Sequence, residues 1–216
     1  MKKSGLIHGL LLLLFASACL SLEFLRPRNT LGCFISDLAG RSEEQRTNIL
    51  LACRALDGIQ IEPKGVFSFN RVVGPRSLER GYRFAPAFLE NEKRESLGGG
   101  ICQVSSTLYA AVLDGGFEVL KRVPHNFLVS SVPPGRDATV WYGGADLVWR
   151  NDTSDPVRLE AEVEGDRCRV RILGRKKRRV SLSTRQVPAS RPRTRVFQTS
   201  RLIDGHASFL LDVYRK

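Results

Sequence analysis

The residues best suited to chemistry are Cys102 and the three glycines before it, Gly98 to Gly100. Glycine permits positive φ angles and lets another backbone or a ligand approach closely. Apolar residues recur at helical spacing after Cys102, which predicts that this thiol opens a helix. A helix N-terminus lowers the pKa of a cysteine, and its free N–H groups can stabilise an oxyanion. The segment therefore indicates a thiolate nucleophile for acyl transfer, and the alternative is a tight turn before a structural cysteine.

His125 is the natural partner for that thiol. The other two histidines, His8 and His206, lie near the ends of the chain, whereas His125 precedes an expected strand in the body of the domain. A histidine can take the thiol proton and later return it to a leaving group. The alternative is a partly buried histidine that only bonds a neighbour.

Further candidates surround this pair. Asp137 and Asp146 could each orient the imidazole, and we take Asp137 as catalytic. The planar fork of Arg136 suits a substrate carboxylate. Turn formation and surface ion pairing are the alternatives for all three. The substrate-binding candidates are Gly99, Gly100, Gln103, Ser105, Ser106, Arg136, Tyr142 and Asp146. No CxxC pair or zinc-like spacing occurs, so we expect neither metal nor cofactor.

The elements that must position these residues follow from local patterns. Ser42-Glu43-Glu44-Gln45 is a capping box, which predicts a helix as far as Gly58. We expect a strand at 66–69, an edge strand or extended loop at 82–89, a hairpin loop at 90–96 and a helix at 102–113. Later β runs are expected at 117–120, 127–132, 138–142, 146–149, 157–163 and 167–173. The fold class is α+β, with a mixed or antiparallel sheet, a central helix opening at Cys102 and a capping N-terminal helix.

The composition changes at Gly174, so we divide the chain there. Residues 31–173 form the main domain. A block of like charge, Arg175 to Arg179, then begins a region rich in Arg, Pro, Ser and Thr. Such a region is a linker or a solvated strand region, and 202–214 regains apolar character. We assign 174–216 as a basic linker and C-terminal tail.

The N-terminus resembles a secretory signal. A basic start, an apolar run from Leu10 to Phe15 and the small residues Ala16-Ser17-Ala18 predict a signal peptide at 1–18. Cys19 permits a lipoprotein signal, and an uncleaved anchor is the minority alternative. All three predict export to the cell envelope. In an oxidising compartment Cys33 and Cys53 could form a disulfide, or they are two small buried thiols.

The net charge of +12 favours an anionic partner. Nucleic acid, anionic lipid and acidic wall polymers all qualify, but the predicted export argues against nucleic acid.

These residues also resemble a known family. The segment Leu97-Gly98-Gly99-Gly100-Ile101-Cys102-Gln103-Val104-Ser105-Ser106-Thr107-Leu108-Tyr109 is similar to the signature of the VanW family, named for a protein of glycopeptide-resistance gene clusters. Other segments match in the same order: Val66–Asn70, Val73–Arg76, Arg80–Tyr82, Pro124-His125, Val132–Val140, Asp146-Leu147 and Asn151–Thr153. The resemblance spans about 31–173, which makes that range a VanW-like domain.

The resemblance implies an exported protein associated with peptidoglycan. Some members are understood to be L,D-transpeptidases that form 3-3 cross-links with a cysteine, which corresponds by position to Cys102. The His-Gly-Cys motif of the common L,D-transpeptidase domain is absent from this sequence. We therefore expect a cysteine-dependent acyl transferase, L,D-transpeptidase-like, on stem peptides. The alternative is a non-catalytic cell-wall binding protein. Expected partners are peptidoglycan or its precursors and anionic envelope polymers, with membrane contact only through a signal or lipid anchor.

Overall fold

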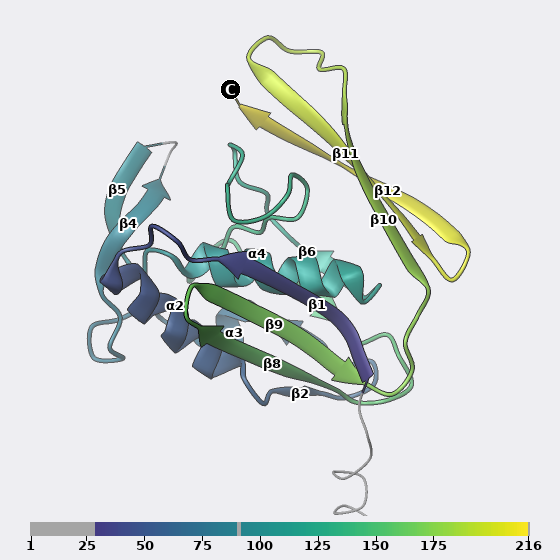
Figure 1. Ribbon diagram of the computed structural model, residues 1–216, viewed down its shortest axis with the longest axis horizontal. Helices are drawn as coiled ribbons and strands as arrows, with labels where there is room; N and C mark the ends of the chain where they lie inside the picture. The colour runs from purple at the N-terminus through teal and green to yellow at the C-terminus, as the bar shows by residue number, and fades with distance from the viewer. Residues whose placement is uncertain (1–28, 90–91, 216) are drawn as a thin grey trace, which may run out of the picture.

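A four-stranded antiparallel sheet forms one layer of the protein (Figure 1). The computed structural model describes residues 29–89 and 92–215. The sheet has the strand order β1 (Asn29–Asp37), β9 (Arg167–Gly174), β8 (Val157–Glu164) and β2 (Gln60–Ile61). Side chains alternate along β8 and β9: Val157, Leu159, Val170 and Ile172 face the core, while arginines and glutamates pair on the outer face. The predicted strands at 157–163 and 167–173 are confirmed.

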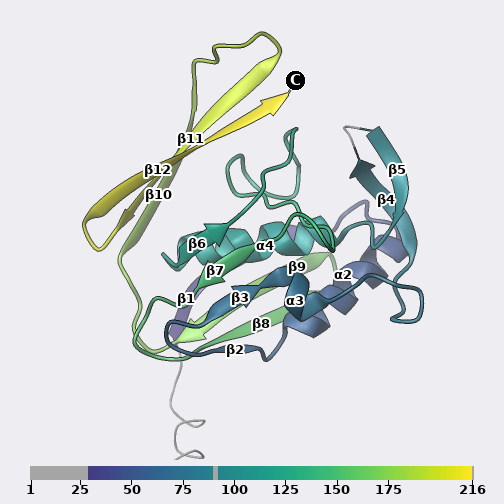
Figure 2. The same cartoon turned by 180° about the vertical axis from the view of Figure 1, so that it is seen from behind.

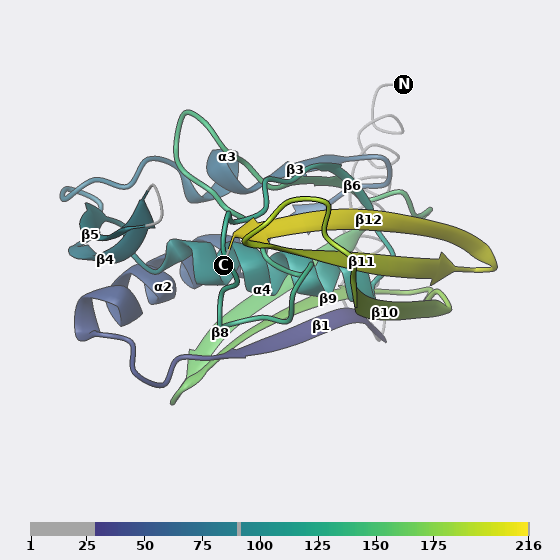
Figure 3. The same cartoon turned by 90° about the horizontal axis from the view of Figure 1, so that it is seen from above.

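The helix α4 (Ile101–Asp114) lies at the centre of the molecule, and the expected α+β class is confirmed. One side of it packs on β1 and β9. A second sheet lies on the other side and consists of β3 (Val66–Ser68), β7 (Val148–Arg150) and β6 (Glu118–Lys121), as Figure 3 shows. Trp149 of β7 joins the same core. Because α4 has neighbours on both sides, nearly all its residues are buried. The buried set includes four polar side chains that are hydrogen-bonded: Gln103, Ser105, Ser106 and Thr107.

The capping N-terminal helix is also confirmed, as α2 (Glu43–Leu56). The Ser42 hydroxyl accepts from the Gln45 amide at 3.3 Å, and the Gln45 side chain accepts from the Ser42 amide at 3.1 Å. A short helix α3 (Phe69–Val73) follows β3.

A hairpin of β4 (Phe84–Leu89) and β5 (Glu92–Leu97) leads into α4. The loop expected at 90–96 is therefore mostly a strand. Its polar side chains resemble those of a loop because this two-stranded hairpin pairs with no other described strand.

The segment 122–147 is irregular, so the strands expected at 127–132 and 138–142 are wrong. Val132, Ala138 and Val140 are buried because the loop lies against α4, and this burial gives the segment a strand-like pattern. Its backbone bonds go to turns within the loop and to side chains instead of a strand ladder. The Ser106 hydroxyl, for example, accepts from the Ala138 amide at 3.0 Å.

Residues after Gly174 form a third sheet, which extends away from the main body in Figures 1 and 2. Its strands are β10 (Val180–Val187), β11 (Thr194–Ile203) and β12 (His206–Arg215), in that order. The solvated-strand alternative thus describes this region, and the linker assignment does not. Tyr214 and Asp212 of β12 are buried against the loop 122–147, while Phe209, Leu211 and Val213 are exposed.

The expected signal peptide and Cys19 lie outside the described residues. Within 29–89 and 92–215, no helix is long and apolar enough to cross a membrane. The suggested disulfide between Cys33 and Cys53 does not form, because Cys53 instead lies next to Cys168, with a sulfur–sulfur distance of 3.7 Å.

Candidate active site

The glycines before Cys102 allow α4 to begin in close contact with its neighbours. Gly100 caps the helix with φ of 100°, in the left-handed region that favours glycine. A Cβ on Gly99 would lie 2.3 Å from the carbonyl oxygen of Ala85 in β4. The Gly99 carbonyl accepts from the Asn48 side chain of α2 at 2.9 Å. Both glycines, predicted as substrate-binding, thus fix the start of the helix and the position of Cys102 on its first turn.

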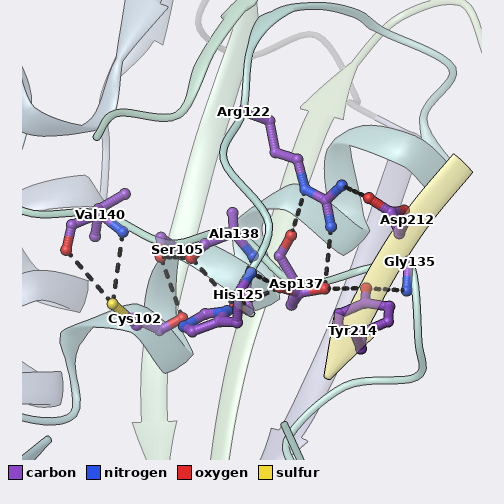
Figure 4. Close-up of polar contacts among 11 residues, drawn as sticks. Cys102, Ser105, Arg122, His125, Gly135, Asp137, Ala138, Val140, Asp212 and Tyr214 are labelled. Atoms are coloured by element: carbon purple, nitrogen blue, oxygen red, sulfur yellow. Dashed lines mark hydrogen bonds and ion pairs between the residues drawn. The ribbon is translucent and has the colours of Figure 1, made fainter. Parts of the chain in front are cut away.

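Cys102, His125 and Asp137 lie together in one site, in which His125 is bonded to Asp137 and the sulfur of Cys102 to Val140 (Figure 4). Nδ1 of His125 donates to Oδ2 of Asp137 at 2.8 Å, and the His125 amide donates to the same oxygen at 2.6 Å. The other ring nitrogen, Nε2, is then left available to Cys102, and each of these two side chains shifts the pKa of the other. The thiol itself donates to the carbonyl oxygen of Val140 at 3.4 Å. The Val140 amide also donates to the Cys102 sulfur, at 3.5 Å. We call Cys102, His125 and Asp137 the triad.

The electrostatics of the triad favour an ionised thiol. Burial alone would raise the pKa of Cys102, but the hydrogen bond and charge of His125 outweigh it and hold that pKa below its ordinary value. Burial alone would lower the pKa of His125, but its bonds to Asp137 and Cys102 raise that pKa to about 9. Burial opposes the charge of Asp137, yet the bond from His125 and the charge of Arg122 keep its pKa lowered. These shifts favour the thiolate–imidazolium form of the pair beside the ionised carboxylate of Asp137.

The carboxylate of Asp137 is held by groups that come from distant parts of the chain. The Tyr214 hydroxyl of β12 donates to Oδ1 at 2.6 Å, and Nη2 of Arg122 donates to the same oxygen at 3.0 Å. Arg122 also pairs with Asp212 of β12. The Tyr214 oxygen in turn accepts from the Gly135 amide at 2.8 Å. The C-terminal sheet therefore fixes the acidic member of the triad.

Ser105 and Ser106 lie beside the triad but bond the protein itself. The Ser105 hydroxyl donates to the carbonyl of Ala138 at 2.7 Å, and Ser106 accepts from the Ala138 amide. Both side chains are buried. They therefore hold the residue next to Asp137 against α4, a role that differs from the predicted contact with substrate.

Three other predicted residues lie away from the reacting atoms. The Gln103 side chain is buried among Ser36, Asp37 and Arg41. Arg136 pairs with Asp114 at the opposite end of α4, with Nη1 and Oδ1 3.0 Å apart, so it does not join the Cys102 site. Asp146 accepts from the Ser68 hydroxyl at 2.6 Å and from the Asn70 amide at 2.9 Å, which makes it a cap for α3.

Tyr142, the aromatic residue predicted to bind substrate, lies on the surface and is 56% exposed. Trp141 next to it is equally exposed, whereas Trp149 is fully buried. Tyr142 lies beside Arg76, whose guanidinium carbon is 6.0 Å from the ring centroid. Arg76 also lowers the pKa of Cys102, in addition to the larger effects of burial and His125.

Sequence reasoning overlooked four residues that shape the site. Arg122 lies three positions before His125, and its nearness to the only central histidine could have drawn notice. Tyr214 and Asp212 lie in a segment with no chemical motif. Arg76 entered the sequence analysis only as the last residue of Val73–Arg76, one of the segments that resemble the VanW family.

The fold and the site together define a class: an α+β protein with a cysteine–histidine–aspartate constellation, the arrangement that activates thiol nucleophiles. The model of the family described as VanW like protein matches residues 44–173. The chain belongs to the VanW family.

Two curated relatives support this membership. The chain is 41% identical over 135 residues to the uncharacterized protein YoaR of Bacillus subtilis, covering 62% of this chain and 45% of that protein. It is 31% identical over 118 residues to the vancomycin B-type resistance protein VanW of Enterococcus faecalis, covering 51% of this chain and 42% of that protein. The chain thus spans less than half the length of each relative. No solved structure matches it significantly.

Proposed function

We propose that this protein is an exported, cysteine-dependent acyl transferase, L,D-transpeptidase-like, that acts on peptidoglycan stem peptides. The observation that carries the proposal is the triad, in which a half-buried thiol on the first turn of α4 has its pKa lowered by an imidazole that is itself fixed by a buried carboxylate. A thiol that served only to fill space would need neither partner.

The proposed reaction has two steps. The Cys102 thiolate attacks the carbonyl carbon between an L-centre and a D-residue. The carbon–nitrogen bond breaks, His125 gives its proton to the leaving amine, and a thioester forms. An amine of a second stem then attacks the thioester while His125 takes the amine proton, and the thiolate leaves. If water replaces the amine, the outcome is hydrolysis.

Donors for the developing oxyanion are available next to the sulfur. The Val140 amide points at Sγ, and the first-turn amides of α4 carry the partial positive charge of a helix N-terminus. Such fixed donors can be worth about 3–4 kcal/mol of transition-state stabilisation.

The choice of peptidoglycan as substrate rests on the family and on the charge. The net charge of +12 favours binding to the anionic polymers of a cell wall. Export rests on the pattern of residues 1–18, and mapping the N-terminus of the protein recovered from the envelope would test it. An intact N-terminus on protein found only in the cytoplasm would contradict export.

The decisive experiment compares Cys102→Ala with the native protein in muropeptide profiles of cells that express each one. We expect 3-3 cross-linked species with the native protein and their loss with Cys102→Ala. Cys33→Ala is the matched control, because Cys33 lies on β1, outside the triad.

Purified protein and disaccharide tetrapeptides provide the biochemical counterpart. A thioester adduct on Cys102, seen by mass spectrometry, is the expected intermediate. Binding of wall fragments without turnover, together with full function of Cys102→Ala in cells, would favour the cell-wall binding alternative.

A further inference from the structure

The guanidinium of Arg76 is a charged group beside the triad whose bonding is incomplete. Nη1 donates to the carbonyl oxygen of Gly74 at 2.8 Å. Nη2 is buried and has no hydrogen-bond partner among the described residues. A buried donor without a partner costs about 1–3 kcal/mol, and more when the group is charged. The unpaired Nη2 of Arg76 is therefore a candidate donor to a bound ligand.

The charges around Arg76 leave it without a carboxylate partner among the described residues. No carboxylate in the described ranges comes within ion-pair distance of its guanidinium. The acids that raise its pKa are Tyr82, the Cys102 thiol and, with the smallest effect, Asp146. Asp146 is already bonded to Ser68 and Asn70. Burial raises the pKa of the neighbouring Tyr82, so that phenol stays neutral, and Arg80 adds a second positive charge. Buried charges in proteins are generally paired. The Cys102 thiolate compensates part of the Arg76 charge but makes no hydrogen bond to Nη2, so this donor is left for a second anion.

The protein also holds this side chain in place. Its guanidinium carbon lies 5.8 Å from the ring centroid of Phe69, which is fully buried. Its aliphatic stem lies against Gly98, where a Cβ would come within 2.9 Å of Cγ of Arg76. The same glycine run that starts α4 therefore makes room for the arginine. Tyr142, which is 56% exposed, flanks the guanidinium, with its ring centroid 6.0 Å from the guanidinium carbon.

We infer that Arg76 binds a carboxylate of the substrate, namely the α-carboxylate of the residue that leaves when Cys102 attacks. This inference rests on the proposed function. Arginine binds carboxylates through two parallel bonds, and the orphaned Nη2 supplies one of them. Only the leaving nitrogen and its Cα separate that carboxylate from the scissile carbonyl. The Arg76 side chain packs against Gly98, four residues before Cys102, and is therefore placed to bind it. The donor substrate is then a peptide with a free C-terminus one residue beyond the scissile bond.

The first test uses two alkylating probes at Cys102, iodoacetate and iodoacetamide. Each forms a bond from Sγ to carbon and releases iodide, but only iodoacetate carries a carboxylate. The ratio of their rates cancels any change in thiolate content. We expect Arg76→Gln to lower the iodoacetate-to-iodoacetamide ratio at least fivefold, since a fivefold change corresponds to about 1 kcal/mol of charge attraction. Peptide mapping by mass spectrometry restricts the measurement to Cys102.

Arg80→Gln is the matched control, because Arg80 is an exposed arginine of the same loop that donates to the Pro75 carbonyl. Its ratio should stay within twofold of the native value. Arg76→Lys keeps the charge without the planar fork and should give an intermediate ratio. An unchanged ratio in Arg76→Gln, with a native circular dichroism spectrum, would overturn the inference.

The second test separates this inference from the proposed function. Stem tetrapeptides are offered with a free or an amidated C-terminus. The native protein should turn over the free acid with at least tenfold higher kcat/KM, and Arg76→Gln should remove the difference mainly through KM. Equal turnover of acid and amide would reject the carboxylate site and leave the proposed function standing. An Arg76-dependent alkylation ratio without turnover of either peptide would reject the transpeptidase and leave the carboxylate site standing.

Discussion

Replacing Asp137 by Asn removes one charge from the triad while keeping the shape of the side chain. In the native protein the Asp137 carboxylate accepts from the His125 ring at 2.8 Å, from the His125 amide at 2.6 Å and from the Tyr214 hydroxyl at 2.6 Å. An amide oxygen can accept some of these bonds, but it carries no charge to stabilise an imidazolium. The substitution therefore changes the proton balance between His125 and Cys102.

The size of the effect follows from the pKa of His125. That pKa is about 9, compared with 6.5 for an ordinary histidine, a difference of about 3.4 kcal/mol. Burial opposes this rise, and the bonds and charges of Asp137 and Cys102 produce it. A charge-assisted hydrogen bond contributes about 1.5–3 kcal/mol, so the loss of Asp137 should cost the imidazolium about 2 kcal/mol. The proton equilibrium between thiol and imidazole then shifts by a factor of about 30 toward the neutral pair.

The assay is the rate at which iodoacetamide alkylates Cys102 at pH 7. Because the thiolate is the reactive form, Asp137→Asn should react about ten to thirty times more slowly than the native protein. Asp114→Asn is the control, since Asp114 pairs only with Arg136 at the far end of α4, about 20 Å along the helix axis. Its alkylation rate should match the native rate.

Unfolding in urea provides a second readout, because the stability lost in Asp137→Asn should change with pH in a defined direction. A raised pKa of His125 stabilises the fold fully below about pH 6.5, and this contribution disappears as the pH rises through 9. The lowered pKa of Asp137 stabilises the fold at pH values above the ordinary pKa of an aspartate. The stability lost in Asp137→Asn should therefore be larger at pH 6 than at pH 10. Alkylation within twofold of native by a folded Asp137→Asn protein would refute this account of the triad.

Three further predictions concern the surroundings of the triad. Tyr214→Phe removes a 2.6 Å bond to the triad carboxylate and should lower the free energy of unfolding by about 1.5–3 kcal/mol in urea titrations. An unchanged unfolding midpoint would contradict the role of the Tyr214 hydroxyl in holding Asp137. Gly99→Ala places a Cβ 2.3 Å from the Ala85 carbonyl oxygen, and calorimetry should show a loss of about 1–3 kcal/mol in the free energy of unfolding. Native stability in this variant would mean that β4 moves away at no cost. Cys53 and Cys168, with sulfurs 3.7 Å apart, should form a disulfide in oxidised glutathione. Non-reducing peptide mapping should detect the bond, and the free energy of unfolding should rise by about 2–4 kcal/mol. Recovery of both residues as free thiols would count against this prediction.

The core of the site was predictable because its residue types are rare and their local setting is informative. Only one cysteine follows three glycines, and only one histidine lies in the body of the domain. A capping box likewise fixed the start of α2, since both of its bonds join residues three positions apart. These features depend on short stretches of chain, which sequence patterns describe well.

The rest depends on contacts between distant residues. Tyr214 lies 77 positions from Asp137, and nothing in its own strand signals that contact. Ser105 and Ser106 were placed correctly beside the nucleophile but bond the Ala138 backbone, because the loop that they hold has no strand partner. Arg136 is adjacent in sequence to Asp137, yet its side chain extends to the other end of α4. Local sequence patterns cannot show toward which distant residue a side chain extends.

The position of Tyr214 on an outer strand has a consequence for how the protein loses its chemistry on heating. β12 pairs with β11 alone among the named strands, and the side chains at 206–211 are exposed. Such weakly packed segments open as separate cooperative units, at free energies well below that of global unfolding. When β12 opens, the triad carboxylate loses its phenol while the central helix stays folded. Amide hydrogen exchange should therefore be fast in β12 and slow in α4, and the thiol should become unreactive before the far-ultraviolet signal of the core is lost.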